Sequence, residues 1–158
     1  MRTVKRVDRA SRLIRAAVAD VYRAFTEPQA FIAWLPPEGM TGTLLAFDPV
    51  PGGVYRIALR YDEPDADTVG KTSEDEDVAE GRFVELIPNR RIVQTGSFES
   101  DDPAFAGTMT IAWGFEAVEG GTRVSVAASD VPQGIGQRDH EDGLKSSLAN
   151  LAAFVEHG

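Results

Sequence analysis

Cysteine is absent from the sequence, and only two of its 158 residues are histidine. The absence of cysteine excludes disulfide scaffolds, thiolate zinc sites, iron–sulfur clusters and cysteine nucleophiles. His140 and His157 show no metal-ligand spacing with neighbouring carboxylates. We therefore expect neither a metal site nor a bound cofactor.

Long apolar runs and an excess of positive charge are absent too. The longest apolar run spans six residues, 30–35, whereas a membrane span needs about 20 and a signal-peptide core about 7–15. The 16 lysines and arginines are outnumbered by 25 acidic residues, which gives a net charge of −9. Nucleic acid is an unfavourable partner for such a chain, because phosphates repel acidic proteins. We therefore expect a cytoplasmic protein with no membrane span and no nucleic-acid partner.

The acidic excess is concentrated in residues 62–80, which contain nine acidic side chains and one lysine. This stretch has no apolar periodicity and is interrupted by proline and glycine, so it predicts a long solvated loop. Part of it matches a calcium-binding pattern that runs from Asp65 through Asp67 to Glu76. Val69 occupies one of the ligand positions and has no side-chain oxygen. We therefore favour a solvated rim, or a docking surface for a basic partner, over a calcium site.

The length of the chain predicts a single domain over residues 1–158, with its core between 7 and 156. Hydrophobic residues make up 42% of the sequence, enough for a buried core. The N-terminus is rich in arginine, as in a transit peptide, but residues 7–14 fit better as a first β-strand.

Two periodicities divide the rest of the chain. Apolar residues spaced three and four apart predict short helices over 18–25 and 31–35 and a long helix over 139–156. Alternation with a period of two predicts strands at 55–61, 82–87, 92–98, 108–115 and 122–128. The order of strand, two short helices, about six consecutive strands and one long helix indicates an α+β fold with an antiparallel sheet. If that sheet is strongly curved, a cavity can remain between its apolar face and the last helix.

Several short motifs occur in an order and spacing that together are specific. They are Trp34-Leu-Pro-Pro-Glu-Gly-Met40, Phe47-Asp48, Pro51-Gly-Gly-Val-Tyr55, Gly81-Arg-Phe-Val-Glu-Leu-Ile-Pro88, Arg91-Ile-Val93, Gly121-Thr-Arg-Val124 and Asp139-His-Glu-Asp-Gly143. Through them the chain resembles the activator of heat-shock protein 90 ATPase homologue family, within the START-like (SRPBCC) superfamily. The resemblance covers residues 7–156.

This resemblance implies a helix-grip fold like that of the birch-pollen allergen. In that fold a curved antiparallel sheet of about seven strands surrounds a long C-terminal helix, with two short helices after strand 1. Members often enclose a hydrophobic cavity, but the superfamily shares no single set of catalytic residues. Leu144 stands where many members have tryptophan, and Val50 where many have arginine. The resemblance therefore implies a fold and a pocket, and neither a ligand nor a reaction.

We expect the wall of this cavity to come from large apolar residues of the strands and helices. They are Trp34, Tyr55, Ile57, Leu59, Phe83, Met109, Ile111, Trp113, Leu144 and Leu148. The same residue types form ordinary cores, and the sequence does not separate core from pocket.

Glu85 and His140 are the candidate polar groups, either to orient a ligand or to act as acid–base catalysts. Glu85 shares a strand face with Phe83, so it is either a pocket acid or the partner of an inward arginine. His140 is either structural or a group at the pocket mouth, where an imidazole can change charge near neutral pH. Gly143 indicates either close packing or space for a ligand, because a helical glycine costs roughly 1 kcal/mol relative to alanine.

Three functions fit these observations. The first is the binding of a small hydrophobic or amphipathic molecule, and the second is a cyclase- or hydrolase-like enzyme that uses Glu85 or His140. The third is a co-factor of the heat-shock protein 90 ATPase, as the family name suggests. It ranks last, because the eukaryotic activator carries an additional N-terminal domain for which 158 residues leave no room. A chaperone or a second copy of the chain stays open as a macromolecular partner.

Overall fold

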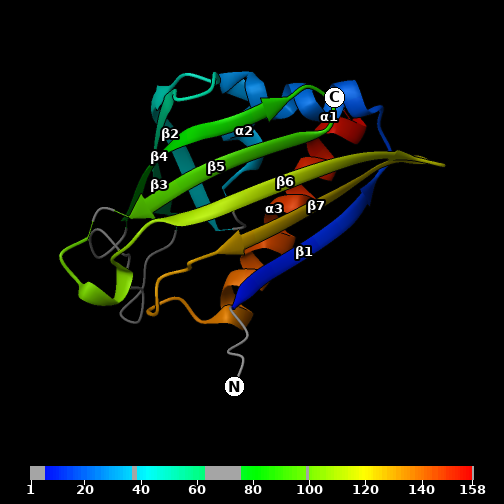
Figure 1. Cartoon of the computed structure of the whole chain (residues 1–158). Helices are drawn as coiled ribbons and strands as arrows, with labels where there is room; N and C mark the ends of the chain where they lie inside the picture. The colour runs from blue at the N-terminus through cyan, green and yellow to red at the C-terminus, as the bar shows by residue number, and fades with distance from the viewer. Residues whose placement is uncertain (1–5, 37–38, 63–75, 99, 158) are drawn as a thin grey trace.

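The computed structural model describes residues 6–36, 39–62, 76–98 and 100–157. Its elements follow the chain in the order β1 (Val7–Ile14), α1 (Val18–Thr26), α2 (Pro28–Trp34), β2 (Met40–Phe47), β3 (Val54–Tyr61), β4 (Glu76–Ile87), β5 (Arg91–Phe98), a short 3-10 helix (Pro103–Phe105), β6 (Met109–Val118), β7 (Gly121–Ser129) and α3 (Gln137–His157) (Figure 1).

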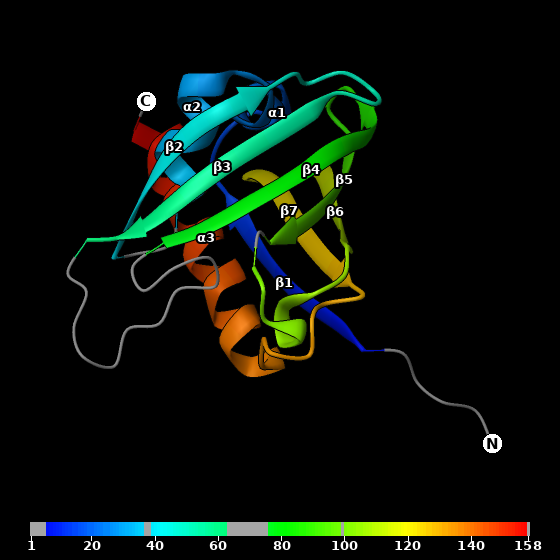
Figure 2. The same cartoon turned by 90° about the vertical axis from the view of Figure 1, so that its left-hand side faces the viewer.

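Seven antiparallel strands form one sheet in the order β1-β7-β6-β5-β4-β3-β2, with β1 and β2 at its edges. Figures 1 and 2 show the sheet curving around α3, with α1 and α2 together at one end. The predicted α+β helix-grip fold is thereby confirmed, including the two short helices after the first strand. None of the helices in the described part of the chain is long and apolar enough to cross a membrane.

Helix α3 also covers the open edge of β1. The backbone N–H of Arg9 donates to Oε2 of Glu141 at 2.8 Å, and that of Arg15 donates to Oε2 of Glu156 at 3.1 Å. An edge strand otherwise exposes such donors to other chains. These two contacts hold the helix along the first strand.

The sequence of β2 does not identify it as a strand, because its pattern is irregular. A bulge between Leu44 and Ala46 shifts its register with β3. As a result Leu44 and Phe47, three positions apart, both pack against the core. A spacing of three does not show the alternation by which strands are recognised.

The predicted solvated loop over 62–80 is wrong at its C-terminal end, because β4 begins at Glu76. Cross-strand ion pairs explain why an acidic sequence forms a strand there: Arg60 faces Glu76 and Arg56 faces Glu80 in register, with N–O distances of 3.5 Å and 3.8 Å. Asp77, on the other face, is only 3% exposed. Residues 63–75, and with them most of the calcium-like pattern, lie outside the described residues.

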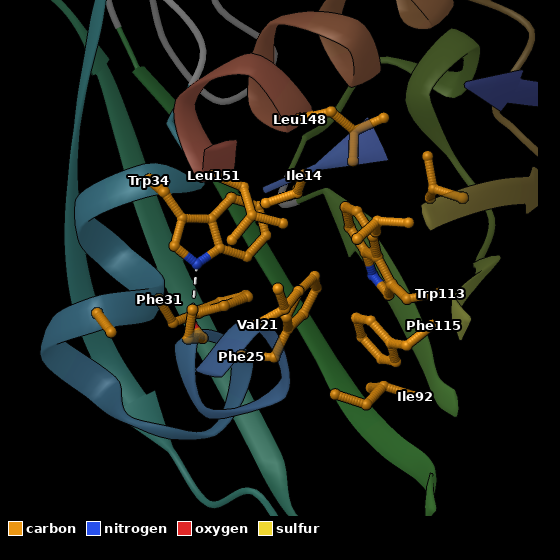
Figure 3. Close-up of a cluster of buried hydrophobic side chains, with 14 of the residues drawn as sticks. Ile14, Val21, Phe25, Phe31, Trp34, Ile92, Trp113, Phe115, Leu148 and Leu151 are labelled. Atoms are coloured by element: carbon orange, nitrogen blue, oxygen red, sulfur yellow. Dashed lines mark hydrogen bonds between the residues drawn. The ribbon is translucent and has the colours of Figure 1, made fainter. Parts of the chain in front are cut away.

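An aromatic cluster fills the space between α1, α2, the sheet and the second half of α3 (Figure 3). The ring of Phe25 lies at centroid distances of 4.7 Å from Trp34, 4.9 Å from Trp113 and 5.0 Å from Phe115. The indole of Trp34 donates to the carbonyl of Ala24 at 2.8 Å, so its burial leaves no unpaired donor (Figure 3). Leu148 and Leu151 close this core from α3.

The Pro51–Gly53 turn between β2 and β3 explains part of the family motif. Gly52 has φ of +83°, a conformation that favours glycine. A Cβ on Gly53 would lie 1.9 Å from the carbonyl oxygen of Asp48. The two glycines also exchange backbone hydrogen bonds with Phe83, at 2.7 Å and 2.8 Å. The turn therefore fastens the β2–β3 hairpin to β4.

Candidate functional site

A cavity of about 350 Å³ lies between the sheet and the first half of α3. Its described lining is mostly apolar, and it comprises Phe31, Leu35, Met40, Tyr55, Ile57, Leu59, Tyr61, Asp77, Ala79, Gln94, Gly96, Phe98, Met109, Ile111, Trp113, Ile135, Asp139, His140, Gly143, Leu144 and Ser147. The volume falls at the lower end of the range of small-molecule sites, about 300–1,000 Å³.

Most residues predicted for the wall lie in this lining, and three do not. Tyr55, Ile57, Leu59, Met109, Ile111, Trp113 and Leu144 line the cavity, together with His140. Trp34, Phe83 and Leu148 are 1% exposed and belong to the core instead. Their side chains belong to the core cluster beside the second half of α3, whereas the cavity lies beside the first half of that helix.

Several lining residues were not predicted, although some carried a signal. Gln94, Gly96 and Phe98 occupy alternate positions of β5 and share its inward face, so the period of two identifies them. The sequence pattern places Asp77 in the solvated loop, and its inward position follows only from the extended strand β4.

The ring of Tyr55 lines the cavity, but its hydroxyl group is hydrogen-bonded within the protein and is not available to a ligand. The hydroxyl donates to the carbonyl of Thr95 at 2.6 Å. It reaches this carbonyl across Gly81, where a Cβ would lie 1.7 Å from the same oxygen. Burial raises the pKa of the Tyr55 hydroxyl well above its ordinary value. Tyr55 is therefore a neutral wall residue under all ordinary conditions.

Gly143 opens a space on the cavity side of α3. A Cβ placed on Gly143 meets no atom within 4 Å, and the residue is part of the lining. Of the two interpretations that the sequence left open, the geometry favours space over close packing.

An ion-pair network joins β1 to the start of α3 beside the cavity. The buried carboxylate of Asp8 accepts hydrogen bonds from Nε and Nη2 of Arg6, each at 2.8 Å. Oδ2 of Asp8 also lies 2.7 Å from Nδ1 of His140. Nη2 of Arg6 donates further to the carbonyl of Ile135 at 2.8 Å. Since Ile135 and His140 line the cavity, the network positions one part of its wall.

The charge of Asp8 sets the orientation of His140. Burial alone would raise the pKa of Asp8, but hydrogen bonds from Arg6 and His140 outweigh it and hold that pKa below its usual value. An ionised carboxylate can only accept, so Nδ1 of His140 carries the hydrogen that faces Asp8. The other ring nitrogen, Nε2, makes no hydrogen bond to any residue that the structure describes. The arrangement leaves Nε2 available to a bound molecule.

Glu85 is not part of the cavity, and its prediction as a pocket acid is wrong. A bulge between Phe83 and Glu85 breaks the alternation of β4. Phe83 is consequently buried, whereas the Glu85 side chain is 46% exposed and lies 3.0 Å from Nε of Arg91. Glu85 does form an ion pair, but with an exposed arginine on the outer face rather than an inward one.

No group of three or more histidine, aspartate or glutamate side chains that could hold a metal ion occurs among the described residues. The side chain of His157 lies outside them.

Comparison with known proteins places the chain among similar sequences and folds. A family model described as "Activator of Hsp90 ATPase homolog 1-like protein" matches residues 15–156. The protein CV1439 of Chromobacterium violaceum is 31% identical, with 95% of this chain and 96% of that chain covered, and its crystal structure has a TM-score of 0.83. A search among curated proteins gives no match.

More distant structures share the fold. A Staphylococcus epidermidis protein is 18% identical over 99% of this chain and 93% of that chain, with a TM-score of 0.75. An Arthrobacter aurescens protein is 12% identical over 96% and 87% of the two chains, with a TM-score of 0.78. At these identities the likeness concerns the fold alone.

Proposed function

Because the chain belongs to the family of activator of Hsp90 ATPase homolog 1-like proteins, within the START-like superfamily, we propose that it binds a small apolar or amphipathic molecule. The binding site is the cavity between the curved sheet and α3. Ile57, Ile111 and Leu144 supply apolar wall, and His140 with Gln94 supplies polar groups.

The observation that carries this proposal is the size of the apolar space. The cavity of about 350 Å³ is lined mostly by apolar side chains, and each Å² of apolar surface that a bound molecule covers contributes roughly 25 cal/mol. A small apolar molecule in this space would cover wall that the protein does not pack by itself, and that burial is the driving force for binding.

We expect native mass spectrometry of the protein purified from its own host to show a small molecule as added mass. In a thermal-shift screen of fatty acids and aromatic molecules, a ligand at a hundred times its Kd contributes about 2.7 kcal/mol. That contribution should raise Tm by about 5–10 °C for a chain of this length. A protein that is always empty, and whose Tm no member of the screen changes, contradicts the proposal.

Acid–base catalysis on the bound molecule is the second candidate, favoured by the pairing of His140 with Asp8. A carboxylate that holds one ring nitrogen leaves the other free to accept a proton, as in general bases of many enzymes. The ligand would have to bring its proton within about 2.6–3.2 Å of Nε2.

This candidate is tested with 2-naphthyl acetate, an aromatic ester, in wild type and in His140→Phe. Phenylalanine keeps a planar ring and removes the proton acceptor. Hydrolysis that disappears in a folded His140→Phe variant that still binds apolar ligands supports the candidate. Equal turnover in the two proteins excludes it and leaves binding as the function.

A further inference from the structure

Trp113 holds the amide of Gln94 in one orientation. Gln94 lies on β5, lines the cavity and is 3% exposed. Its Oε1 accepts a hydrogen bond from Nε1 of Trp113 at 2.9 Å. An indole N–H is a donor only, so the amide must turn its oxygen toward Trp113 and its NH₂ group away.

The NH₂ group of Gln94 has no partner among the residues that the structure describes. Within that part of the chain, no fully enclosed side-chain nitrogen or oxygen lacks a partner, so Nε2 of Gln94 retains accessible surface. For a side chain that is 97% buried and lines the cavity, that surface faces the cavity.

The neighbouring buried polar groups do not compete for this role. The hydroxyl of Tyr55 donates to the carbonyl of Thr95, and that of Ser147 donates to the carbonyl of Leu35 at 2.9 Å. The carboxylate of Asp77 supplies acceptors. Among the described lining residues that are more than nine-tenths buried, Gln94 is therefore the side chain whose hydrogen-bond donors, the N–H groups of its amide, are not used within the described part of the protein.

An unpaired donor of this kind discriminates between ligands. A purely apolar molecule in the cavity removes water from the NH₂ group and returns no hydrogen bond, which costs binding energy. A molecule with an acceptor at that point avoids the cost. Sites built around buried polar groups reject analogues that lack the matching group for this reason.

We propose that the ligand is an apolar molecule with a neutral carbonyl oxygen, and that this oxygen accepts a hydrogen bond from the Gln94 NH₂ group. The inference rests on the proposed binding function and adds the class of ligand and the residue that recognises it. Neutrality follows from the wall, because the described lining contains no lysine or arginine. Asp77 and Asp139 are acidic, and any positive charge on the His140 ring is already paired with the carboxylate of Asp8. A carboxylate would lose its hydration there without a cation to replace it.

The test compares 2-acetylnaphthalene with 2-ethylnaphthalene, which differ in one carbonyl oxygen and have nearly the same shape. Calorimetric titration gives both dissociation constants for wild type and for Gln94→Met, which keeps side-chain length and lacks donors. The ratio of the ethyl to the acetyl Kd is expected to fall by about five- to tenfold in Gln94→Met, the effect of one hydrogen bond. The two free ligands are hydrated differently, but this difference is the same for both proteins. It therefore cancels when the Kd ratio of the variant is compared with that of wild type.

Two further variants test whether the change in the Kd ratio comes from the loss of the Gln94 NH₂ donors. Gln94→Glu, at pH 8, keeps an oxygen for Trp113 and replaces the NH₂ group by a second oxygen, and the same fall is expected. Gln29→Met makes the same chemical change as the test variant at an exposed position of α2, and the ratio should not change. 2-Naphthoate should bind wild type more weakly than 2-acetylnaphthalene does.

The outcomes separate this inference from the proposed function. If both naphthalenes bind and neither Gln94 variant changes the ratio, recognition by Gln94 is overturned while cavity binding stands. Tighter, Gln94-dependent binding of 2-naphthoate overturns the neutral class. If wild type binds neither naphthalene, the proposed function fails, and the inference fails with it.

Discussion

Asp8→Asn is expected to lower the free energy of unfolding by about 2–3 kcal/mol. The carboxylate is fully buried and receives three contacts of 2.7–2.8 Å from Arg6 and His140. Asparagine has the same size, but it loses the negative charge and turns an NH₂ donor toward groups that also donate. Breaking a fully enclosed pair costs about 3–5 kcal/mol. The loss here is smaller because the Arg6 side chain is 33% exposed and can turn to water.

Urea denaturation at pH 7 measures this loss, with Asp20→Asn as the matched control. Asp20 undergoes the same chemical change, but its side chain is 55% exposed and its partner Arg23 is 3.3 Å away on the helix surface. Surface pairs of this kind contribute less than about 0.5 kcal/mol. A loss at Asp8 no larger than that at Asp20 would contradict the structural role of the network.

The same network makes part of the stability depend on acid pH. The pKa of Asp8 is lower in the folded protein than in the unfolded chain, where it is about 3.9. Its contribution is therefore fully present above that value and is lost as the pH falls through the lower, folded pKa. Below about pH 4 the wild type should lose stability more steeply than Asp8→Asn, so the difference between the two proteins narrows on acidification.

The fold could be predicted because its periodic signals are long and regular. Tyr55, Ile57 and Leu59 alternate along one strand, and all three face the cavity. Each inward position of such a strand follows from its neighbour, since the side chains point to opposite faces in turn.

Bulges mark the places where this reasoning fails. One extra residue in a strand moves every later side chain to the opposite face of the sheet. No particular residue type in the sequence indicates where such a bulge occurs. The sequence left open whether Glu85 is a pocket acid or part of an ion pair, and the bulge before it places Glu85 on the surface in an ion pair with Arg91. The bulge between Leu44 and Ala46 likewise interrupts the alternation at the end of β2.

The sequence could not show which apolar residues belong to the core and which line the cavity, and the reason is different. Trp34 and Trp113 are the same residue type, and their rings lie 5.8 Å apart between centroids. Yet Trp113 lines the cavity and Trp34 does not. Whether a residue lines the cavity depends on its position relative to the space between the sheet and the first half of α3. That space is set by the tertiary structure and not by residue type. The pairing of Asp8 with His140, 132 residues apart, is likewise a consequence of tertiary structure.

Gly143→Phe is expected to weaken the binding of cavity ligands by roughly ten- to hundredfold, the effect of about 1–3 kcal/mol of overpacking. The substituent enters open space, because a Cβ at this position meets no atom within 4 Å. The free protein should become more stable by roughly 1–2 kcal/mol, since the helix loses a glycine and the ring is buried. Binding and stability should therefore change in opposite directions.

Ala153→Phe is the matched control, because it places the same ring on an exposed position of α3 outside the lining. Calorimetric titration with the ligands found in the thermal-shift screen should give unchanged affinities for this variant. A surface site would leave the affinity of Gly143→Phe unchanged as well, and that result would move the binding site away from the cavity. Lower stability in Gly143→Phe would show instead that the space beside α3 closes in solution. Weaker binding in a more stable protein is the combination that only an open, ligand-filled cavity produces.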